Sequence, residues 1–234
     1  MKIEERESAC FDLLKRLHRD KYVLIGGYAV SAFDFPRFSV DLDIAIKEEE
    51  LEIFTDLLEG QGYSQAIRSD KFSWIYKGEF IRFEREVSGL NVSADLLVNV
   101  VQSRQTSSAY SFEYLFKNSE MRKVIGYSQD LAVKARVADR EMLIALKANS
   151  MRLADQRDII ALCNGKVDVE KVAKHLERCP KDVIKENIRR LLATIEDPKQ
   201  KDSIKGVFGV SDKLYERVIS RAEAIFMKLE RVLN

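Results

Sequence analysis

The stretch VLIGGYAVSAFDFPRFSVDLDIAI, residues 23–46, decides the fold that we predict for this chain of 234 residues. Its apolar beginning breaks at a glycine pair, Gly26 and Gly27. Glycine has no side chain and tolerates left-handed backbone conformations, so backbone N–H groups at such a pair can approach an anion closely. A helix that begins there adds the positive end of its dipole. The pair therefore predicts a strand-to-helix turn that can hold a phosphate.

The end of the same stretch carries two carboxylates. Asp41 and Asp43 lie two positions apart in residues 40–46, which read as a strand. Because side chains alternate across a strand, both carboxylates point to the same face. They could line an exposed strand face or edge, or they could bind a metal. With the glycine pair, they suggest an enzyme that holds a nucleoside triphosphate by its phosphates and its divalent metals.

Length and composition favour a folded protein with two domains. A chain of this length with 46% hydrophobic residues can bury a core. No segment approaches the roughly 18 to 20 uninterrupted apolar residues that would span a bilayer, and the N-terminus is too acidic for a secretory signal. Cys10, Cys163 and Cys179 lack zinc-ligand spacing and are typical of thiols in a reducing compartment. We therefore expect a soluble, cytoplasmic protein with no membrane partner.

The net charge of +1 conceals an asymmetry along the chain. Residues 1–60 hold 8 Lys and Arg against 14 Asp and Glu, whereas residues 61–234 hold 31 against 24. The basic remainder is compatible with a nucleotide or RNA partner, because Lys and Arg neutralise phosphates. The solvated faces of an ordinary helical domain would explain the same charges.

Hydrophobic periodicity predicts an α+β domain followed by a helical domain. Helices are expected over residues 4–19, 28–33, 48–59 and, ambiguously, 107–118; strands are expected over residues 22–25, 40–46, 72–76, 80–86, 92–101 and 129–137. Asp139 is a good N-cap for a helix over residues 140–151, and the pattern beyond it is almost entirely helical. We therefore place the domain boundary near residue 138.

A third carboxylate lies in the apolar run SADLLVNVV. Asp95 could face solvent there, but a buried, unpaired charge is costly and normally has a partner or a metal. Two like charges about 4 Å apart repel by roughly 4 kcal/mol at an effective dielectric constant near 20, so Asp41, Asp43 and Asp95 would need a divalent cation if they met. Magnesium suits oxygen-only ligands. Two Mg²⁺ ions, or Mn²⁺ in their place, could clamp an in-line nucleotidyl displacement.

Aromatic residues offer a candidate surface for a nucleotide base. Trp74, Tyr76 and Phe80 could stack on the base, although aromatic residues in short strands more often belong to the core.

Taken in order, these residues resemble the DNA polymerase β-like nucleotidyltransferase superfamily. The matching pattern is Ile25-Gly26-Gly27, then Arg37-x-Ser39-x-Asp41-Leu42-Asp43, then Asp95 in a later strand. It corresponds to the glycine pair, the Asp-x-Asp strand and the third strand carboxylate of that superfamily. The resemblance covers residues 22 to about 101.

The resemblance implies a nucleotidyltransferase domain at residues 1–138, with a mixed β-sheet flanked by helices, and a helical domain at residues 139–234. It also implies metal-dependent transfer of a nucleoside monophosphate from an NTP to a hydroxyl acceptor, with release of pyrophosphate. Asp41, Asp43 and Asp95 would then be catalytic and would ligate the metals. A non-catalytic NTP- or RNA-binding protein on the same fold is the alternative.

Nucleotide binding would fall to residues next to these carboxylates. The resemblance implies that Gly26 and Gly27 bind the β and γ phosphates. Many members of the superfamily have Gly-Ser at this turn, whereas the toxin-like members also carry Gly-Gly. Ser39 shares the strand face of the carboxylates and could contact the triphosphate. Arg37 could pair with a phosphate, or it could pack on its own loop.

The helical half shows a second, looser resemblance. The run Glu141-x5-Lys147-x4-Arg152-x2-Asp155-x2-Asp158 is similar to that of bacterial and archaeal nucleotidyltransferases related to abortive-infection toxins. This similarity implies that Lys147 or Arg152 lies near the triphosphate and that Asp158 is a structural or active-site acid. The same side chains could equally form surface ion pairs. In such a toxin, the acceptor would be tRNA or a protein hydroxyl, and an antitoxin would be a partner.

Overall fold

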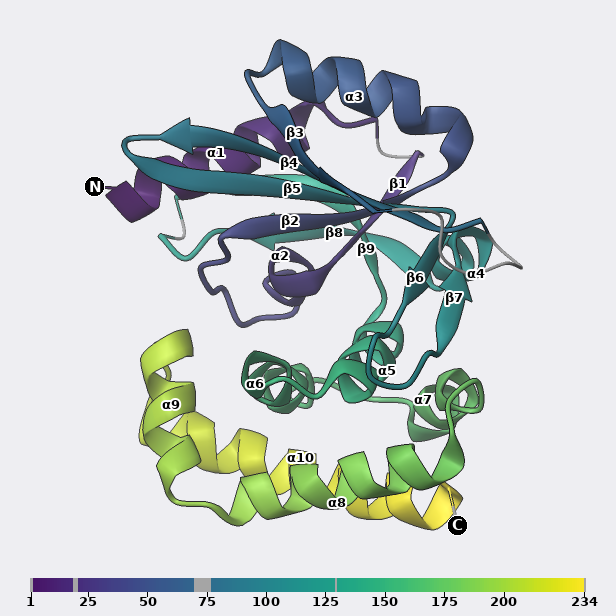
Figure 1. Cartoon of the computed structure of the whole chain (residues 1–234). Helices are drawn as coiled ribbons and strands as arrows, with labels where there is room; N and C mark the ends of the chain where they lie inside the picture. Colours follow the sequence, from purple (N-terminus) through teal and green to yellow (C-terminus); the bar gives the residue numbers. More distant parts are fainter. Residues whose placement is uncertain (1, 19–20, 70–76, 129, 234) are drawn as a thin grey trace. The chain divides into compact units, whose positions relative to one another are not determined.

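The computed structural model describes residues 2–18, 21–69, 77–128 and 130–233 (Figure 1). The chain forms two compact units. The first comprises Met1–Ala32, Pro36–Val101 and Tyr110–Ala138, and the second comprises Phe33–Phe35, Gln102–Ala109 and Asp139–Asn234. Two short segments, Phe33–Phe35 and Gln102–Ala109, therefore belong to the same unit as the helical C-terminal part, although they are far from it in sequence.

Seven strands among the described residues form a mixed sheet. Their order across the sheet is β3-β4-β5-β2-β1-β9-β8. Their bounds are Tyr22–Ile25 (β1), Asp41–Ile46 (β2), Ser64–Arg68 (β3), Glu79–Val87 (β4), Leu90–Val98 (β5), Ser119–Ile125 (β8) and Ala132–Ala138 (β9). β2 pairs with β5 and β1 with β9 in parallel, whereas the other neighbours are antiparallel. β6 (Val100–Gln102) and β7 (Ala109–Ser111) form a separate two-stranded sheet.

One face of the large sheet is the apolar core of the first unit. The register places these buried side chains on that face: Leu24, Leu42, Ile44, Ile81, Phe83, Ala94, Leu96 and Val137. Helices α1 (Lys2–Arg16) and α3 (Leu51–Gly60) cover it (Figure 1). A short 3-10 turn, Glu48–Glu50, leads into α3. Because side chains alternate, the residues between these apolar positions face the opposite side.

The two remaining helices of the first unit lie next to β1. α2 (Gly26–Val30) continues directly from the end of β1. α4 (Phe112–Lys117) begins after Ser111, whose side chain accepts a hydrogen bond from the backbone N–H of Tyr114. The sequence therefore turns from strand to helix at the glycine pair, as the lack of side chains there allows.

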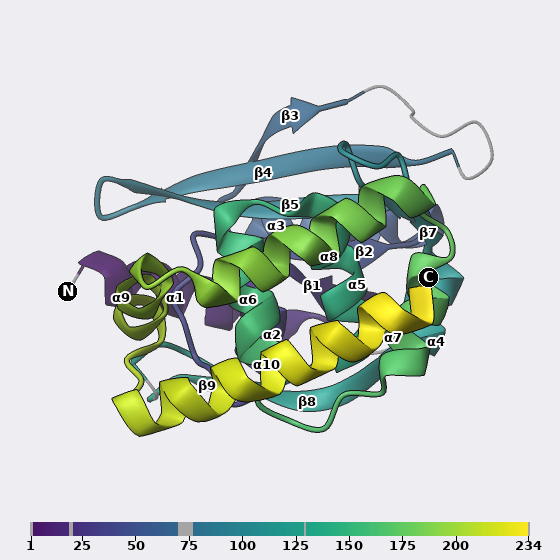
Figure 2. The same cartoon turned by 90° about the horizontal axis from the view of Figure 1, so that it is seen from below.

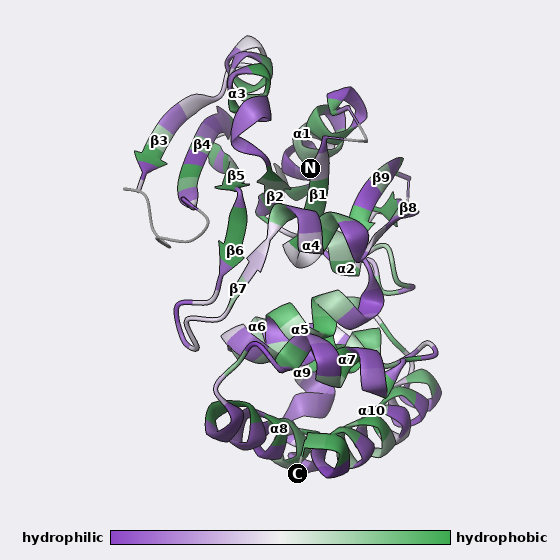
Figure 3. Ribbon diagram, turned by 90° about the vertical axis from the view of Figure 1, so that its right-hand side faces the viewer, coloured by the Kyte–Doolittle hydropathy of each residue, from purple (hydrophilic) through white to green (hydrophobic). Residues whose placement is uncertain are grey.

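The second unit is helical in the part described. Its helices are α5 (Arg140–Ser150), α6 (Leu153–Leu162), α7 (Val169–Leu176), α8 (Lys181–Glu196), α9 (Lys199–Phe208) and α10 (Asp212–Leu233). α8 and α10 run side by side (Figures 1 and 2). Hydrophobic and hydrophilic stripes alternate along both, as expected of amphipathic helices (Figure 3). No helix in the described ranges is long and apolar enough to cross a membrane.

Most of the elements predicted from periodicity are confirmed. The strands predicted at residues 22–25, 40–46, 80–86 and 129–137 correspond to β1, β2, β4 and β9, and the helices at 4–19 and 48–59 correspond to α1 and to the 3-10 turn with α3. The predicted cap is also confirmed, because the Asp139 side chain accepts a hydrogen bond of 2.9 Å from the backbone N–H of Met142. The strand predicted at residues 72–76, with Trp74 and Tyr76, lies outside the described residues, as does Gln129.

Some predicted boundaries are wrong. The helix predicted over residues 28–33 is α2, which begins at Gly26 because the glycine itself takes up the turn, with φ of +76°. The strand predicted over residues 92–101 breaks at Asn99, whose φ is +64°. Asn tolerates this conformation better than most residues. Its side-chain oxygen also accepts a hydrogen bond of 2.9 Å from the backbone N–H of Glu48. The ambiguous segment 107–118 is a short strand followed by α4.

Candidate active site

Aspartates from two neighbouring strands meet on the sheet face opposite the apolar core. Asp41 and Asp43 lie on β2 and Asp95 lies on β5, and the parallel register sets Asp43 beside Asp95. A carboxylate oxygen from each residue lies within 4.8 Å of the other two. Asp95 is 3% exposed, and the other two are half-buried. Since carboxylates this close repel one another, the arrangement favours a bound countercharge.

Gly26 forms part of the wall of this cluster. A Cβ atom at this position would lie 1.9 Å from Oδ2 of Asp43. Its backbone also has φ of +76°, a conformation that L-amino acids with side chains rarely adopt. The carboxylate of Asp43 therefore packs directly against the glycine backbone, and any side chain at position 26 would displace it.

Gly27 allows two polar side chains to gather at the start of α2. A Cβ atom there would lie 2.5 Å from Oγ of Ser39 and 2.8 Å from Nη2 of Arg37. Ser39 donates a hydrogen bond of 3.0 Å to Oδ1 of Asp41. The hydroxyl of Tyr28 donates to the carbonyl oxygen of Ser39 at 2.9 Å and so fixes the loop before β2. The structure thus places a guanidinium and a hydroxyl beside Gly27, and the hydroxyl also contacts a carboxylate of the cluster.

A residue that sequence reasoning missed holds Asp95 in place. Arg82 on β4 lies directly opposite Asp95 in the antiparallel pair of β4 and β5. Its Nε donates to Oδ1 of Asp95 at 2.8 Å, and its Nη2 donates to Oδ2 at 2.7 Å. Such charge-assisted, two-point contacts are stronger and more specific in geometry than neutral hydrogen bonds.

The hairpin turn between β4 and β5 explains why these two residues meet. Val87 pairs with Leu90 across the two-residue turn of Ser88 and Gly89, whose φ angles are +54° and +77°. Positive φ at both positions is typical of a type I′ turn. Counting back from that turn along both strands places position 82 opposite position 95. The Ser-Gly pair was therefore the sequence signal that could have identified Arg82.

Burial controls the electrostatics of the third aspartate. Desolvation raises the pKa of the Asp95 carboxyl above its ordinary value, and the hydrogen bonds from Arg82 oppose that shift. The pKa of Arg82 is raised in turn, because Asp95 accepts its hydrogen bonds. Asp95 is thus a more basic carboxylate than an exposed aspartate, and it sits beside a permanent positive charge.

Lys147 and Arg152, which we predict to bind nucleotide, lie in the second unit. Nζ of Lys147 is 2.6 Å from Oδ2 of Asp158 and 3.3 Å from Oδ1 of Asp155. Nε of Arg152 is 2.9 Å from Oδ2 of Asp155. Lys147 and both aspartates are buried, so the alternative of surface ion pairs is wrong for them. Burial alone raises the pKa of Asp155, but Lys147 and neighbouring hydrogen-bond donors lower it overall. The nucleotide-binding role of Lys147 and Arg152 stays a prediction.

Replacing Lys147 with methionine should lower the free energy of unfolding by about 3 kcal/mol, because removing one partner leaves buried charges uncompensated. The loss can be measured by urea denaturation followed by circular dichroism. Lys174→Met, at an exposed position on α7, is the matched control and should change stability little. Equal effects of the two substitutions would contradict a structural role for the pairs of Lys147 with Asp155 and Asp158.

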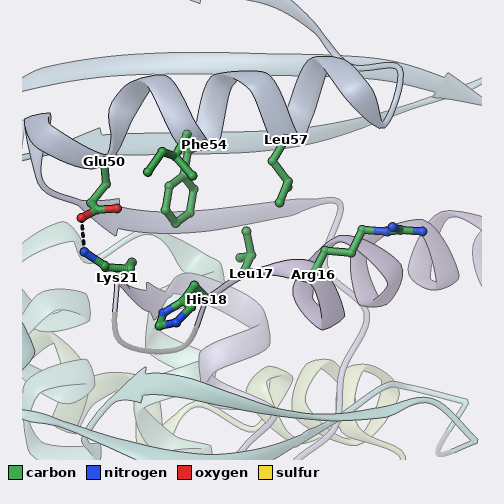
Figure 4. A pocket seen from close by; sticks show the side chains of 8 residues that line it. Arg16, Leu17, His18, Lys21, Glu50, Phe54 and Leu57 are labelled. Carbon is green, nitrogen blue, oxygen red and sulfur yellow. Dashed lines mark hydrogen bonds and ion pairs between the residues drawn. The ribbon is translucent and has the colours of Figure 1, made fainter.

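A pocket of about 200 Å³ lies at the other end of β1 (Figure 4). Leu17, Phe54 and Leu57 contribute apolar walls, and Lys21 forms an ion pair of 2.5 Å with Glu50. The carboxylate in this lining is already paired. The aspartate cluster lies beside the carboxyl end of β1, so this pocket is separate from it.

Comparison with known proteins supports the fold. No family model and no curated protein matches the chain. Among solved structures, a Helicobacter pylori protein proposed to be a nucleotidyltransferase matches with a TM-score of 0.52 and 16% identity, covering 98% of this chain and 97% of that chain. JHP933 from Helicobacter pylori matches with a TM-score of 0.50 and 15% identity, covering 98% and 93%.

This likeness establishes a nucleotidyltransferase-like fold. The central mixed sheet with flanking helices and the helical C-terminal region are shared, which confirms the α+β fold class predicted from the sequence. At such low identity the match extends to the fold alone. The resemblance to the toxin-like subgroup in particular stays a prediction.

Proposed function

We propose that this chain is a nucleotidyltransferase that transfers a nucleoside monophosphate from an NTP to a hydroxyl acceptor and depends on divalent cations. The observation that carries the proposal is the meeting of Asp41, Asp43 and Asp95 beside Gly26. The nucleotidyltransferase-like fold supports it. Asp95 is distant in the sequence from the stretch that carries the glycine pair, Asp41 and Asp43, and the parallel pairing of β2 and β5 brings it beside them.

The aspartates fit a divalent cation by their chemistry and spacing. Their carboxylate oxygens converge within 4.8 Å, and the ligand set contains oxygen only, as Mg²⁺ and Mn²⁺ prefer. Asp41, Asp43 and Asp95 would hold the cations, with two ions expected for an in-line displacement. When bound, such ions neutralise phosphate charge and stabilise the attacking and leaving oxygens.

Arg37, Ser39 and the glycine pair would position the triphosphate. The guanidinium of Arg37 and the hydroxyl of Ser39 lie close against Gly27, and both can donate hydrogen bonds to phosphate oxygens. The absence of a side chain at Gly27 lets the phosphates approach the backbone. These residues would therefore orient the α-phosphate toward the carboxylates.

The proposed reaction is a single displacement at the α-phosphorus. The acceptor hydroxyl oxygen forms the new bond to phosphorus, the bond from phosphorus to the bridging oxygen of the β-phosphate breaks, and pyrophosphate leaves. Asp95 would accept the proton of the hydroxyl. Its position beside Asp41 and Asp43 in the cluster supports this role.

Label transfer tests the proposal and the acceptor together. Incubation with Mg²⁺ and each NTP labelled at the α-phosphate should label one fraction among total RNA, proteins and small hydroxyl compounds. The same NTP labelled at the γ-phosphate should leave every fraction unlabelled, and EDTA should abolish transfer. Label in tRNA or in a protein is the outcome that the toxin-like resemblance implies. Metal-dependent nucleotide binding without transfer to any fraction would contradict an enzyme and fit the non-catalytic alternative.

A further inference from the structure

Arg82, on the neighbouring strand β4, binds the carboxylate of Asp95, the third aspartate of the cluster. Both oxygens of Asp95 accept a hydrogen bond from the guanidinium, at 2.8 and 2.7 Å. The side chain of Asp95 is 5% exposed, whereas that of Arg82 is 31% exposed. Arg82 also lies over the ring of Phe80, at 5.9 Å from its centroid. The arginine is therefore fixed between an aromatic ring and the carboxylate, with part of its surface open to solvent.

We propose that Arg82 competes with the divalent cation for Asp95 and thereby keeps cation affinity low until a nucleotide binds. This inference rests on the proposed function, since it concerns the same aspartate cluster. Arg82 acts here as a positioning residue, because it works through Asp95.

The physical reason is that the carboxylate of Asp95 would have to bind two positive charges, the guanidinium of Arg82 and the divalent cation. A carboxylate offers about four lone-pair sites, and Arg82 uses one on each oxygen of Asp95. A cation that joins Asp41, Asp43 and Asp95 must share those oxygens and approach a guanidinium, which stays charged at every accessible pH. Phosphates bring the negative charge that offsets this repulsion. Cation binding that involves Asp95 should therefore be coupled to nucleotide binding.

Titration of the nucleotide-free full chain with Mn²⁺, followed by the paramagnetic resonance signal of the free ion, tests the inference. Arg82→Gln removes the charge but keeps a hydrogen-bond donor for Asp95, and it should tighten Mn²⁺ binding at least fivefold. Arg82→Lys keeps the charge and should stay within twofold of the wild-type affinity. Adding a non-hydrolysable NTP analogue should reduce the difference between wild type and Arg82→Gln.

Arg68→Gln is the matched control. Arg68 makes the same kind of two-point contact with Glu79, with Nε at 2.6 Å and Nη2 at 3.1 Å from the carboxylate oxygens, on the edge pair of β3 and β4. Its loss should leave Mn²⁺ affinity unchanged. A second measurement uses the wild-type protein, so that no substitution can disturb the fold. The Nε–H resonance of Arg82 is identified by its absence from the spectrum of Arg82→Lys, and in the wild type it should shift as Mg²⁺ is titrated.

The outcomes separate this inference from the proposed function. If the wild type binds Mn²⁺ and Arg82→Gln binds it with equal or lower affinity, Arg82 does not compete with the cation. The proposed cation site would still stand in that case. An Arg82 resonance that ignores Mg²⁺ also overturns the competition. No Mn²⁺ binding by any variant, with or without nucleotide, would reject both the competition and the proposed cation site.

Discussion

Replacing Asp41 or Asp43 with asparagine should lower nucleotide transfer at least about a thousandfold, or roughly 4 kcal/mol in the activation free energy. Asparagine keeps the shape of aspartate but lacks the negative charge that a divalent cation requires. The fold should survive, because both residues are half-buried on the polar face of the sheet. Removing one of several mutually repelling carboxylates should leave the melting temperature unchanged or raise it.

The measurement is α-phosphate label transfer at saturating Mg²⁺, together with Mn²⁺ binding and thermal melting of each variant. Asp56→Asn, at an exposed position on α3, is the control for loss of a carboxylate in the same unit. It should leave transfer and Mn²⁺ binding unchanged. Full activity of Asp41→Asn or Asp43→Asn in the presence of Mg²⁺ would reject this site.

The parts of the site that could be predicted depend on local rules. Alternation along a strand is enough to put Asp41 and Asp43 on one face, and no knowledge of neighbouring strands is needed. The approach of Asp95 to that pair depends on the parallel register of β2 and β5, which no local pattern specifies. Only the order of motifs in a known superfamily indicated it in advance.

The missed strands of the seven-stranded sheet are its two edges. β3 (Ser64–Arg68) is exposed along its whole length, and in β8 (Ser119–Ile125) only Val124 is buried. A strand with little buried surface shows no apolar alternation, so periodicity cannot reveal it. The central strands, which bury one face or, in β1, both faces, were predictable for the opposite reason.

The buried cluster around Lys147 shows a different limit. Lys147 lies on α5, while Asp155 and Asp158 lie on α6. Their contact depends on how two consecutive helices pack across the turn at Met151, which has a left-handed φ of +50°. Charged residues at helical spacing usually lie on a solvated surface. Sequence spacing alone therefore could not distinguish this buried network from ordinary exposed pairs.

Replacing Gly26 with alanine should lower nucleotide transfer about a thousandfold, an effect as large as the loss of Asp43 itself. The added Cβ would lie 1.9 Å from Oδ2 of Asp43, so the carboxylate must leave its place in the cluster. The positive φ of Gly26 adds a backbone cost of about 1 kcal/mol for alanine. Label transfer, Mn²⁺ binding and urea denaturation measure the three consequences.

Gly62→Ala separates the displaced carboxylate from the strained backbone. Gly62 has φ of +80°, close to that of Gly26, but a Cβ atom there would meet nothing within 4 Å. The two substitutions should therefore share the backbone cost in stability, whereas only Gly26→Ala should lose Mn²⁺ binding and transfer. If Gly26→Ala kept its Mn²⁺ affinity and its activity, Asp43 would not be held against the glycine backbone, and the position of Asp43 would not limit the site. Loss of both in Gly62→Ala as well would assign the effect to strain in the fold, because position 62 does not contact the carboxylates.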